Sequence, residues 1–333
     1  MVLLTDAYGR VMRYLRLSVT DRCNLRCRYC RNGKFERFIP HADILRYEEM
    51  LRFVGLATAL GISKIRITGG EPFVRKGCAS FLAMLRQRWP ALDLHITTNG
   101  TLLEPHVPLL AHLGVKAVNL SLDSFDRATF AAVTGRDVLP AVIASMDKLL
   151  TTGLRVKINV VAVRGVNDTQ VDDFVHAAKT LPVDLRFIEF MPMGSGTPWN
   201  RENFWPAVEI EEEISRRVRL TPITDNQENA GPARMYAVAG GRGRIGFITS
   251  MTDHFCRACN RLRLTSDGHV RTCLFTDREY NMRDLLREKR VSDLRLADTL
   301  RRICSLKPIG ADILRLRASG KAVAKRRMTS IGG

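Results

Sequence analysis

The hydrophobic positions up to Phe190 follow two periods that alternate along the chain. Short stretches of alternating or consecutive apolar residues predict β-strands at 14–19, 64–68, 92–97, 117–122, 155–161 and 185–190. Between them, apolar residues recur every three or four positions, which predicts helices at 45–60, 81–89, 105–112, 140–150 and 171–180. The pattern therefore predicts strands and helices in strict alternation.

This alternation predicts βαβ units with a parallel sheet. Six strands are too few for a closed eight-stranded barrel, so we expect an incomplete, TIM-like (β/α)6 barrel. Functional groups gather at the C-terminal strand ends of such folds. Six segments fall at or near those ends: Cys23–Cys30, Gly69–Glu71, Thr97–Asn99, Ser121–Asp123, Lys157–Asn159 and Glu189–Met191. We therefore expect one large cleft at this end of the barrel.

The pattern changes after the glycine-rich segment at 193–198. A polar helix is expected at 209–218, and short strands are expected near 234–238 and 244–248. This region is too short and irregular for an independent domain. We therefore divide the chain into a partial barrel (1–195) and a C-terminal cover (196–333).

Cys23, Cys27 and Cys30 follow the first expected strand with C-x3-C-x2-C spacing. Thiolates this close in sequence can bind one soft metal ion or an iron–sulfur cluster. A structural zinc site needs four ligands, and His41, the nearest further candidate, lies beyond a polar loop. Three thiolates on a cluster of four irons would leave one iron open, which is an arrangement suited to catalysis.

A second group, Cys256, Cys259 and Cys273, has C-x2-C-x13-C spacing. With His254 or His269 as a fourth ligand it would form a structural zinc site. Without a fourth protein ligand it would hold a second iron–sulfur cluster with an open iron. The spacing alone leaves both alternatives open.

The two remaining cysteines, Cys78 and Cys304, lie in helical patterns and are expected to be inert core thiols. With no secretory signal recognised, eight cysteines favour metal ligands over disulfides and a cytoplasmic location. The chain has 52 Lys+Arg against 34 Asp+Glu, a net charge of +18, which suits an anionic partner such as a polyphosphate or nucleic acid. No apolar run reaches the roughly 20 residues of a membrane helix.

Two further motifs indicate ligand contacts. Gly69-Gly70-Glu71-Pro72 follows the second strand, where glycine lets the backbone approach a ligand and a carboxylate can bind an ammonium group. On its own, this motif is equally consistent with a β-turn. Arg261 and Arg263 alternate on a short strand and would present two guanidinium groups to a phosphate chain. Further basic residues on barrel strands add charge to the same site: Arg16, Arg66 and Lys157.

The first cysteine motif, with Tyr29 before its third cysteine, resembles the signature of the radical S-adenosylmethionine (SAM) superfamily. The second cysteine group, Gly-Gly-Glu-Pro, Arg261-Leu262-Arg263 and the terminal Gly332–Gly333 narrow the resemblance to the GTP 3′,8-cyclase (MoaA) family of molybdenum cofactor biosynthesis. The resemblance extends over 15–333. One departure is Arg31-Asn32 after Cys30, where the family usually has Met-Pro.

The resemblance implies a lyase with two 4Fe–4S clusters and SAM that converts GTP to (8S)-3′,8-cyclo-7,8-dihydroguanosine 5′-triphosphate. A 5′-deoxyadenosyl radical would take hydrogen from ribose C3′, and C3′ would then attack C8 of guanine. The resemblance further implies a homodimer and an electron donor of flavodoxin or ferredoxin type. The downstream enzyme would be cyclic pyranopterin monophosphate synthase, and no nucleic-acid or membrane partner is expected.

Carried over residue by residue, the resemblance assigns one cluster to each cysteine group. SAM would be contacted by Tyr29, Gly70, Ser121 and Met191. GTP would be held by Arg16, Arg66, Thr97, Lys157, Arg261, Leu262 and Arg263, with Lys64 and Arg186 as weaker candidates. Gly332 and Gly333 would enter the cleft and act in catalysis together with Arg261, Arg263 and the first cysteine group.

Two other interpretations account for part of the pattern. Another radical SAM enzyme with an auxiliary cluster, such as a peptide maturase, would share both cysteine groups. Such an enzyme would not need the arginine pair or the Gly-Gly end. A zinc-containing nucleic-acid-binding protein would explain the +18 charge but not the six βα units that converge on the cysteines.

Overall fold

The six predicted barrel strands form in the computed structural model, which describes residues 3–30, 38–194, 196–224, 231–316 and 324–332. These strands are β1 (Tyr14–Ser18), β2 (Lys64–Thr68), β3 (Asp93–Thr98), β4 (Ala117–Ser121), β5 (Arg155–Ala162) and β6 (Val183–Glu189). Each pairs in parallel with the next in sequence order, as the alternating pattern predicts. The incomplete TIM-like barrel is therefore confirmed.

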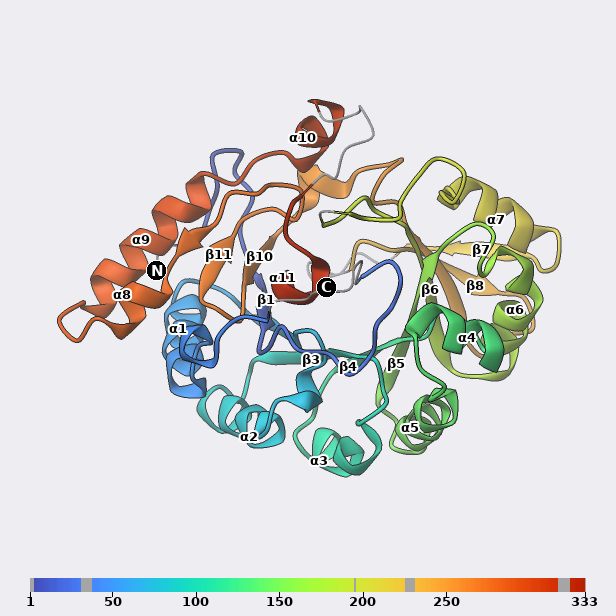
Figure 1. The fold of residues 1–333 in the computed structure, drawn as a ribbon, viewed down its shortest axis with the longest axis horizontal. Coiled ribbons are helices and arrows are strands. Elements are labelled where there is room, and N and C mark those ends of the chain that lie inside the picture. The colour runs from blue at the N-terminus through green and yellow to red at the C-terminus, as the bar shows by residue number, and fades with distance from the viewer. Residues whose placement is uncertain (1–2, 31–37, 195, 225–230, 317–323, 333) are drawn as a thin grey trace.

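Helices cover the outer face of these strands (Figure 1). Those that match the predictions are α1 (Tyr47–Ala59), α2 (Cys78–Arg88), α3 (Val107–His112), α5 (Leu139–Thr151) and α6 (Val171–Thr180). Short 3-10 segments lie at His41–Asp43, Pro72–Val74, Glu104–His106, Asp168–Gln170 and Phe255–Ala258.

Helix α4 (Arg127–Thr134) was not predicted. It begins after Asp126, whose carboxylate accepts a hydrogen bond from the Thr129 N–H, and it ends at Gly135 in the left-handed region. With only eight residues, this helix has too short an apolar pattern to be recognised, whereas both of its caps are visible in the sequence.

The C-terminal region, expected as a cover, also supplies strands to the barrel sheet. β10 (Arg261–Leu264) pairs in parallel with β1, and β9 (Arg244–Ile248) pairs in parallel with β6. Antiparallel strands continue the sheet beyond them, namely β11 (His269–Arg271), β12 (Tyr280–Asn281), β8 (Arg234–Val238) and β7 (Leu220–Ile223). The described residues thus form one 12-stranded sheet in which β1 and β6 are interior strands.

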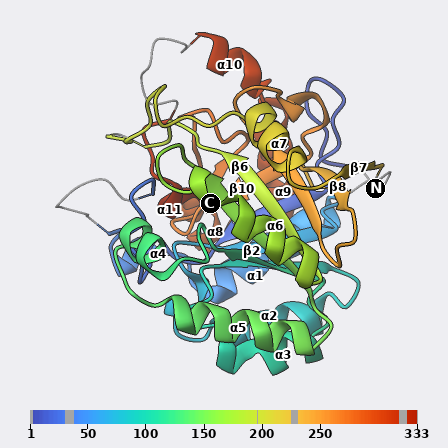
Figure 2. The ribbon, with the colours of Figure 1, turned by 90° about the vertical axis from the view of Figure 1, so that its right-hand side faces the viewer.

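The remaining helices are α7 (Ala207–Ser215), α8 (Arg283–Arg287), α9 (Asp293–Ser305), α10 (Gly310–Leu316) and α11 (Met328–Ile331). α11 lies within the ring of barrel strands (Figure 1), and Figure 2 shows α10 at the end of the molecule opposite α2 and α3. Ile331 of α11 is buried in a small apolar cluster with Met193, Phe275 and Ala324. The C-terminal segment therefore packs into the mouth of the barrel.

The barrel has an apolar outer layer and a polar interior. Leu15, Ile65 and Leu94 are fully buried or nearly so and belong to the main hydrophobic core. Alternate residues of the same strands, such as Arg16 and Arg66, point to the opposite face because side chains alternate along a strand. Among the described residues, no helix has both the length and the apolar character needed to span a membrane.

Candidate active site

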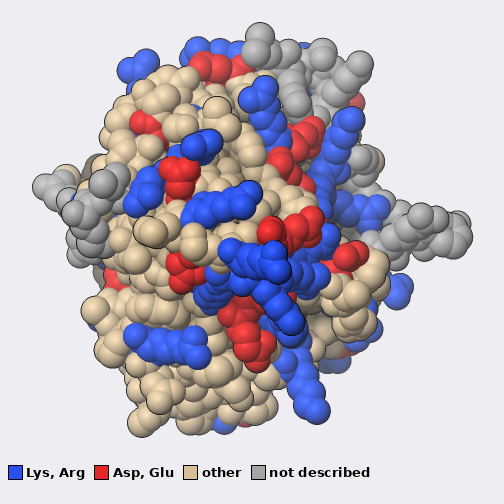
Figure 3. Space-filling model, turned by 90° about the vertical axis from the view of Figure 1, so that its left-hand side faces the viewer, with Lys and Arg blue, Asp and Glu red and all other residues tan. Residues whose placement is uncertain are grey.

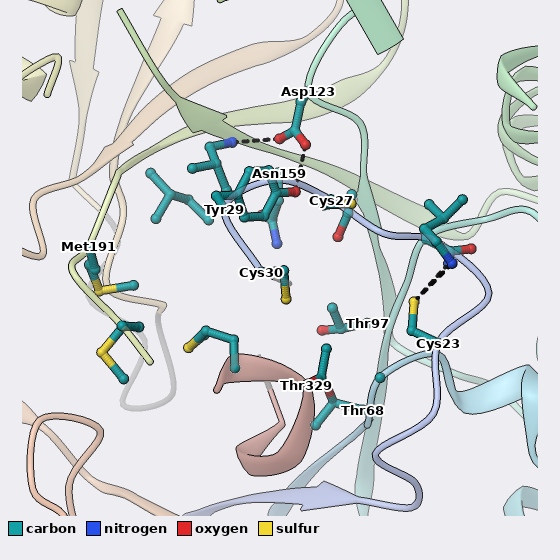
Figure 4. A pocket seen from close by; sticks show the side chains of 18 of the residues that line it. Cys23, Cys27, Tyr29, Cys30, Thr68, Thr97, Asp123, Asn159, Met191 and Thr329 are labelled. Carbon is teal, nitrogen blue, oxygen red and sulfur yellow. Dashed lines mark hydrogen bonds between the residues drawn. The ribbon is translucent and has the colours of Figure 1, made fainter. Parts of the chain in front are cut away.

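The loop after β1 brings Cys23, Cys27 and Cys30 to the C-terminal end of the barrel (Figure 4). None of the three forms a disulfide with a described residue, and all are partly buried. Burial, the Asp123 carboxylate and the two neighbouring thiols together raise the pKa of Cys27 well above its usual value. The three cysteines line one cavity. A positively charged group bound there would lower the pKa values of the thiols and favour their thiolate forms.

A cavity beside these thiols collects the residues predicted to contact SAM. Tyr29, Gly70, Ser121 and Met191 all line it, and so does Thr97, which was predicted to contact GTP. Asp123, Asn159 and Thr329 line it as well (Figure 4). Asp123 and Asn159 follow the strand-end rule, whereas no sequence signal placed Thr329 of α11 here.

A buried hydrogen bond fixes Tyr29 in this cavity. The Tyr29 hydroxyl donates to Oδ2 of Asp123 at 2.6 Å, and the Val161 N–H donates to Oδ1 at 2.8 Å. Burial raises the pKa of Asp123 to about 6, although both hydrogen bonds favour the carboxylate. Asp123 therefore links the cysteine loop to strands β4 and β5.

Glu71 does not take the predicted role of binding an ammonium group with its carboxylate. The side chain is fully buried and accepts hydrogen bonds from the Thr98 hydroxyl at 2.8 Å and the Asn99 N–H at 2.7 Å. It also accepts from the Phe73 N–H at 3.2 Å. Glu71 thus connects the ends of β2 and β3. Gly70, and not Glu71, lines the cavity.

Gly70 is required by a close approach of two loops. The Gly70 N–H donates to the Thr20 carbonyl at 2.7 Å. A Cβ at position 70 would lie 2.2 Å from the Arg22 carbonyl oxygen, so any other residue would displace the loop that leads to Cys23. The cysteine loop and the glycine motif are therefore packed as one unit.

The basic residues predicted to bind GTP lie on the barrel strands, on the face opposite the hydrophobic core. Arg16 pairs in register with Arg66 on β2 and with Arg263 on β10. The Arg66 Nε donates to the Tyr14 hydroxyl at 2.5 Å. Arg261 lies in register with Tyr14, and its guanidinium stacks 4.7 Å from the centre of the Phe255 ring.

Burial and mutual repulsion lower the pKa values of several basic groups in this interior. Burial, followed by neighbouring charges, lowers the pKa of Arg16 to about 10 and that of Arg186 to about 9. Burial and the nearby Arg186 lower the pKa of Lys157 to about 7. The burial of His95, next to Arg66 and Lys64, lowers its pKa to about 2 and keeps it neutral. An anion in this interior would relieve the repulsion.

Leu262 does not fit the predicted set as a side-chain contact. Its side chain belongs to the hydrophobic core, on the opposite face of β10 from Arg261 and Arg263. Only its backbone can take part in a nucleotide contact. Among the weaker candidates, Lys64 is buried on β2 over the Tyr14 ring, and Arg186 donates a hydrogen bond to the Asn159 side chain at 2.6 Å.

The tail already contacts this basic group. The Arg263 Nη1 donates to the Gly332 carbonyl oxygen at 2.7 Å. A Cβ at Gly332 would lie 2.7 Å from the Thr68 side chain, so a larger residue would not fit without displacement. Gly333 and the Arg31-Asn32 segment lie outside the described residues.

The second cysteine group gathers below the first turn of α10. A Cβ at Gly310 would lie 3.0 Å from Sγ of Cys273 and 3.3 Å from Sγ of Cys256. Burial would raise the pKa of Cys259, but Arg261 and Lys307 outweigh it and lower the pKa to about 7. The Arg10 guanidinium also donates to the Cys256 carbonyl at 2.6 Å, which anchors the segment.

Within the part of the chain that the structure describes, no three His, Cys, Asp or Glu side chains converge tightly enough for a single metal ion. Neither His254 nor His269, the two alternatives for a fourth zinc ligand, joins the cysteines in such a group, and His269 Nδ1 lies 3.2 Å from Asp267. In an iron–sulfur cluster the thiolates bind different iron atoms, so their sulfur atoms lie farther apart than they would around a single metal ion. The soft donors in each group fit such a cluster.

Cys78 and Cys304 are buried free thiols, as predicted. Burial raises the pKa of Cys78 to about 12 and that of Cys304 to about 11. Both remain protonated at neutral pH and are inert.

Comparisons with known proteins agree with this arrangement. Residues 17–178 match the radical SAM superfamily, and residues 183–313 match the family described as Molybdenum Cofactor Synthesis C. Streptococcus suis SuiB, solved bound to S-adenosylmethionine, has a similar fold with a TM-score of 0.61 at 13% identity, covering 99% of this chain and 78% of SuiB. The fold and cysteine motif thus define a radical SAM protein.

Sequence relatives show which family of radical SAM proteins the chain belongs to. The GTP 3′,8-cyclase of Thermodesulfovibrio yellowstonii is 40% identical over 99% of this chain and 100% of its own length. That of Geobacter sulfurreducens is 41% identical over 99% of both chains. Molybdenum cofactor biosynthesis protein 1 of Drosophila melanogaster is 40% identical over 89% of this chain and 52% of its own length. The chain belongs to the GTP 3′,8-cyclase family.

Proposed function

We propose that this chain converts GTP to (8S)-3′,8-cyclo-7,8-dihydroguanosine 5′-triphosphate, the first step of molybdenum cofactor biosynthesis. The observation that carries the proposal is a buried basic barrel interior in a chain with two groups of three cysteines outside any described disulfide. Full-length similarity to GTP 3′,8-cyclases supports the same conclusion.

Cys23, Cys27 and Cys30 would hold the first 4Fe–4S cluster, with SAM in the adjoining cavity. The four residues predicted to contact SAM line that cavity. Tyr29 and Ser121 contribute hydroxyl groups, Met191 contributes a thioether, and Gly70 contributes backbone without a side chain. When bound, the cluster and SAM would supply the one-electron chemistry that removes hydrogen from ribose C3′, and closure of the C3′–C8 bond would take up one electron and one proton from outside the nucleotide.

Cys256, Cys259 and Cys273 would hold a second 4Fe–4S cluster. Arg261 lies between this group and the barrel interior, where it lowers the pKa of Cys259 and lies in register with Tyr14. Arg261 is thus placed to bind an anion beside the second cluster. The base of GTP would lie near that cluster, and the phosphates of GTP would lie among the arginines.

The chain's own contribution is to hold GTP in one geometry. Joining C3′ to C8 requires the ribose and base to be held together, and such positioning can supply much of the barrier reduction. Arg16, Arg66, Lys157 and Arg263 present charge from separate strands, so they can grip a triphosphate from several sides. Thr97 adds a hydroxyl at the cavity wall.

The tail would complete this enclosure. Gly332 is placed against Ser18 and Thr68 and is held by Arg263, so the Gly332–Gly333 end would reach the substrate where side chains cannot fit. We further propose a cytoplasmic homodimer that receives electrons from a flavodoxin- or ferredoxin-type donor. Its product would pass to cyclic pyranopterin monophosphate synthase.

Anaerobic reconstitution tests the proposal. The chain should bind about eight irons and no zinc, and it should form 5′-deoxyadenosine and the cyclised nucleotide only when GTP is present. Replacing Cys256 and Cys273 by Ser should lower iron to about four per chain. Zinc at the second group, or deoxyadenosine formation that responds to a peptide instead of GTP, would refute the assignment.

A further inference from the structure

The loop that carries the first cysteine group has exposed arginines on its outer side. Arg26 and Arg28 flank Cys27, and both are exposed whereas Cys27 is partly buried. The Arg26 N–H donates to the Thr134 carbonyl at 2.8 Å, and the Arg28 N–H donates to the Val133 carbonyl at 2.9 Å. These bonds hold the two arginines on the C-terminal end of α4.

A third exposed arginine, Arg136, extends this surface. Gly135 brings it close, because a Cβ at Gly135 would lie 3.3 Å from the Cβ of Arg26. Arg26, Arg28 and Arg136 form no ion pair with any described residue. The neighbouring Asp137 is already paired with Arg127 at 2.7 Å. Among the described residues, these three arginines, called here the loop-arginine surface, therefore have no acidic partner for their positive charge.

We propose that the loop-arginine surface docks an acidic one-electron carrier protein, of flavin or iron–sulfur type, that reduces the first cluster. This inference rests on the proposed function, which requires an electron at that cluster. The step transfers one electron: the carrier is oxidised by one electron, the cluster is reduced by one, and no bond forms or breaks. Docking here would bring the carrier onto the segment that holds Cys27, with no substrate or SAM in between.

Charge complementarity favours this surface over the other basic face of the molecule. Figure 3 shows many Lys and Arg side chains on the side that carries α8 and α9, with Asp and Glu among them. Several of those arginines are paired, including Arg52 with Asp293, Arg287 with Glu49, and Arg302 with Asp298. That face also lies across the molecule from α4 (Figure 1).

The test compares two reductants on the reconstituted protein. In Arg26→Glu/Arg28→Glu, reduction of the iron–sulfur chromophore by a reduced acidic flavodoxin should slow by about tenfold or more at low salt. Reduction by dithionite should be unchanged, because a small anion needs no docking surface. Wild-type reduction by flavodoxin should also slow steeply as salt rises, because the attraction is screened.

Two matched variants locate the effect. Arg290→Glu/Arg295→Glu removes the same charge from the α8–α9 face and should leave both rates unchanged. Arg257→Glu, between Cys256 and Cys259, tests entry at the second group. The proposal is overturned if Arg26→Glu/Arg28→Glu leaves the flavodoxin rate intact or slows both reductants equally, or if Arg257→Glu carries the loss. Chromophore reduction needs no GTP, so the result is independent of whether GTP is the substrate.

Discussion

At the residue scale, burial and neighbouring charges in the barrel interior bring two groups, Lys157 and Tyr14, to pKa values of about 7. Lys157 has a pKa near 7 because it is buried beside Arg186 and Arg155, with only Asp184 opposing them. The Lys157 ammonium lies 4.0 Å from that carboxylate. Burial raises the pKa of Tyr14, but Arg66 and Arg16 outweigh it and lower it to about 7. Both groups therefore titrate near neutral pH.

We therefore predict that GTP binding takes up protons. A bound triphosphate stabilises the charged Lys157 and the neutral Tyr14, so it raises both pKa values from about 7. Between the free and bound pKa values, binding takes up a proton and affinity falls as pH rises. Calorimetry at pH 8 in buffers of different ionisation enthalpy should show net uptake.

Substitution of Lys157 separates its contribution to proton uptake from that of Tyr14. Lys157→Met should reduce proton uptake and weaken GTP binding by about tenfold, because one charge-assisted contact is lost. Lys157→Arg keeps the charge at high pH and should flatten the pH dependence with less loss of affinity. Equal proton uptake in wild type and Lys157→Met would show that Lys157 does not contact the phosphates.

Glu71 supports a second prediction, on stability. Glu71→Gln would turn an amide donor toward the Asn99 N–H or toward the Thr98 and Phe73 donors. A buried donor without an acceptor costs about 1–3 kcal/mol in the free energy of unfolding. Denaturant unfolding should show this loss, whereas Glu48→Gln on the exposed face of α1 should change stability by less than about 0.5 kcal/mol.

At the element scale, the tail is held by a defined clamp. The Arg326 guanidinium lies 2.6 Å from the Asp267 carboxylate and 3.2 Å from that of Glu279. The Lys325 N–H donates to Asp277 at 2.7 Å, and Ala324 bridges to Met193 at the end of the barrel. These contacts place α11, and hence Gly332, in the barrel mouth.

Arg326→Ala should therefore release the tail without unfolding the barrel. Amide hydrogen exchange in residues 324–332 should accelerate by about tenfold or more, since a charged hydrogen bond contributes about 1.5–3 kcal/mol. Exchange in β1 to β6 should not change. Arg315→Ala, which removes an exposed pair with Asp312 in α10, is the control. Unaltered exchange in the Arg326 variant would assign tail placement to Ile331 and its apolar neighbours.

Local patterns explain which elements were predictable. The βα alternation and the cysteine groups depend on periods and spacings within short segments, so the sequence alone identified them. The pairing of β10 with β1 joins residues far apart in the chain, and no local pattern encodes it. Entry of the glycine end into the cleft was expected from the resemblance, whereas helix α11, which brings Thr329 to the cavity, was not predicted. The orientation of the Glu71 side chain likewise depends on Asn99, which follows β3 and lies outside the Gly-Gly-Glu-Pro motif. By contrast, strand alternation alone could have placed Leu262 in the core.

At the scale of the whole molecule, the two parts of the chain share one sheet. β10 covers the edge of β1, and β9 covers the edge of β6, through registers of four and five residue pairs respectively. The boundary predicted near residue 195 thus separates segments that hydrogen-bond to one another on both sides of the barrel. Each part depends on the other for its edges.

A chain that ends after Gly194 should consequently fail to form a stable monomer. It would expose the N–H and C=O groups of β1 and β6, and unpaired edges of this kind promote association with other chains. It would also uncover core residues that pack against the C-terminal region, such as Phe187 against Phe247. Size-exclusion chromatography should show aggregates, and co-expression with residues 196–333 should restore a soluble complex that elutes with the intact protein.

A second truncation, after Leu316, provides the control. It keeps the twelve described strands and removes residues 317–333, which include α11. It should remain folded, with unchanged near-ultraviolet circular dichroism. If the chain that ends after Gly194 were itself monomeric and cooperatively folded, residues 1–195 would be an independent domain. The C-terminal strands would then be additions to a finished barrel and not part of its construction.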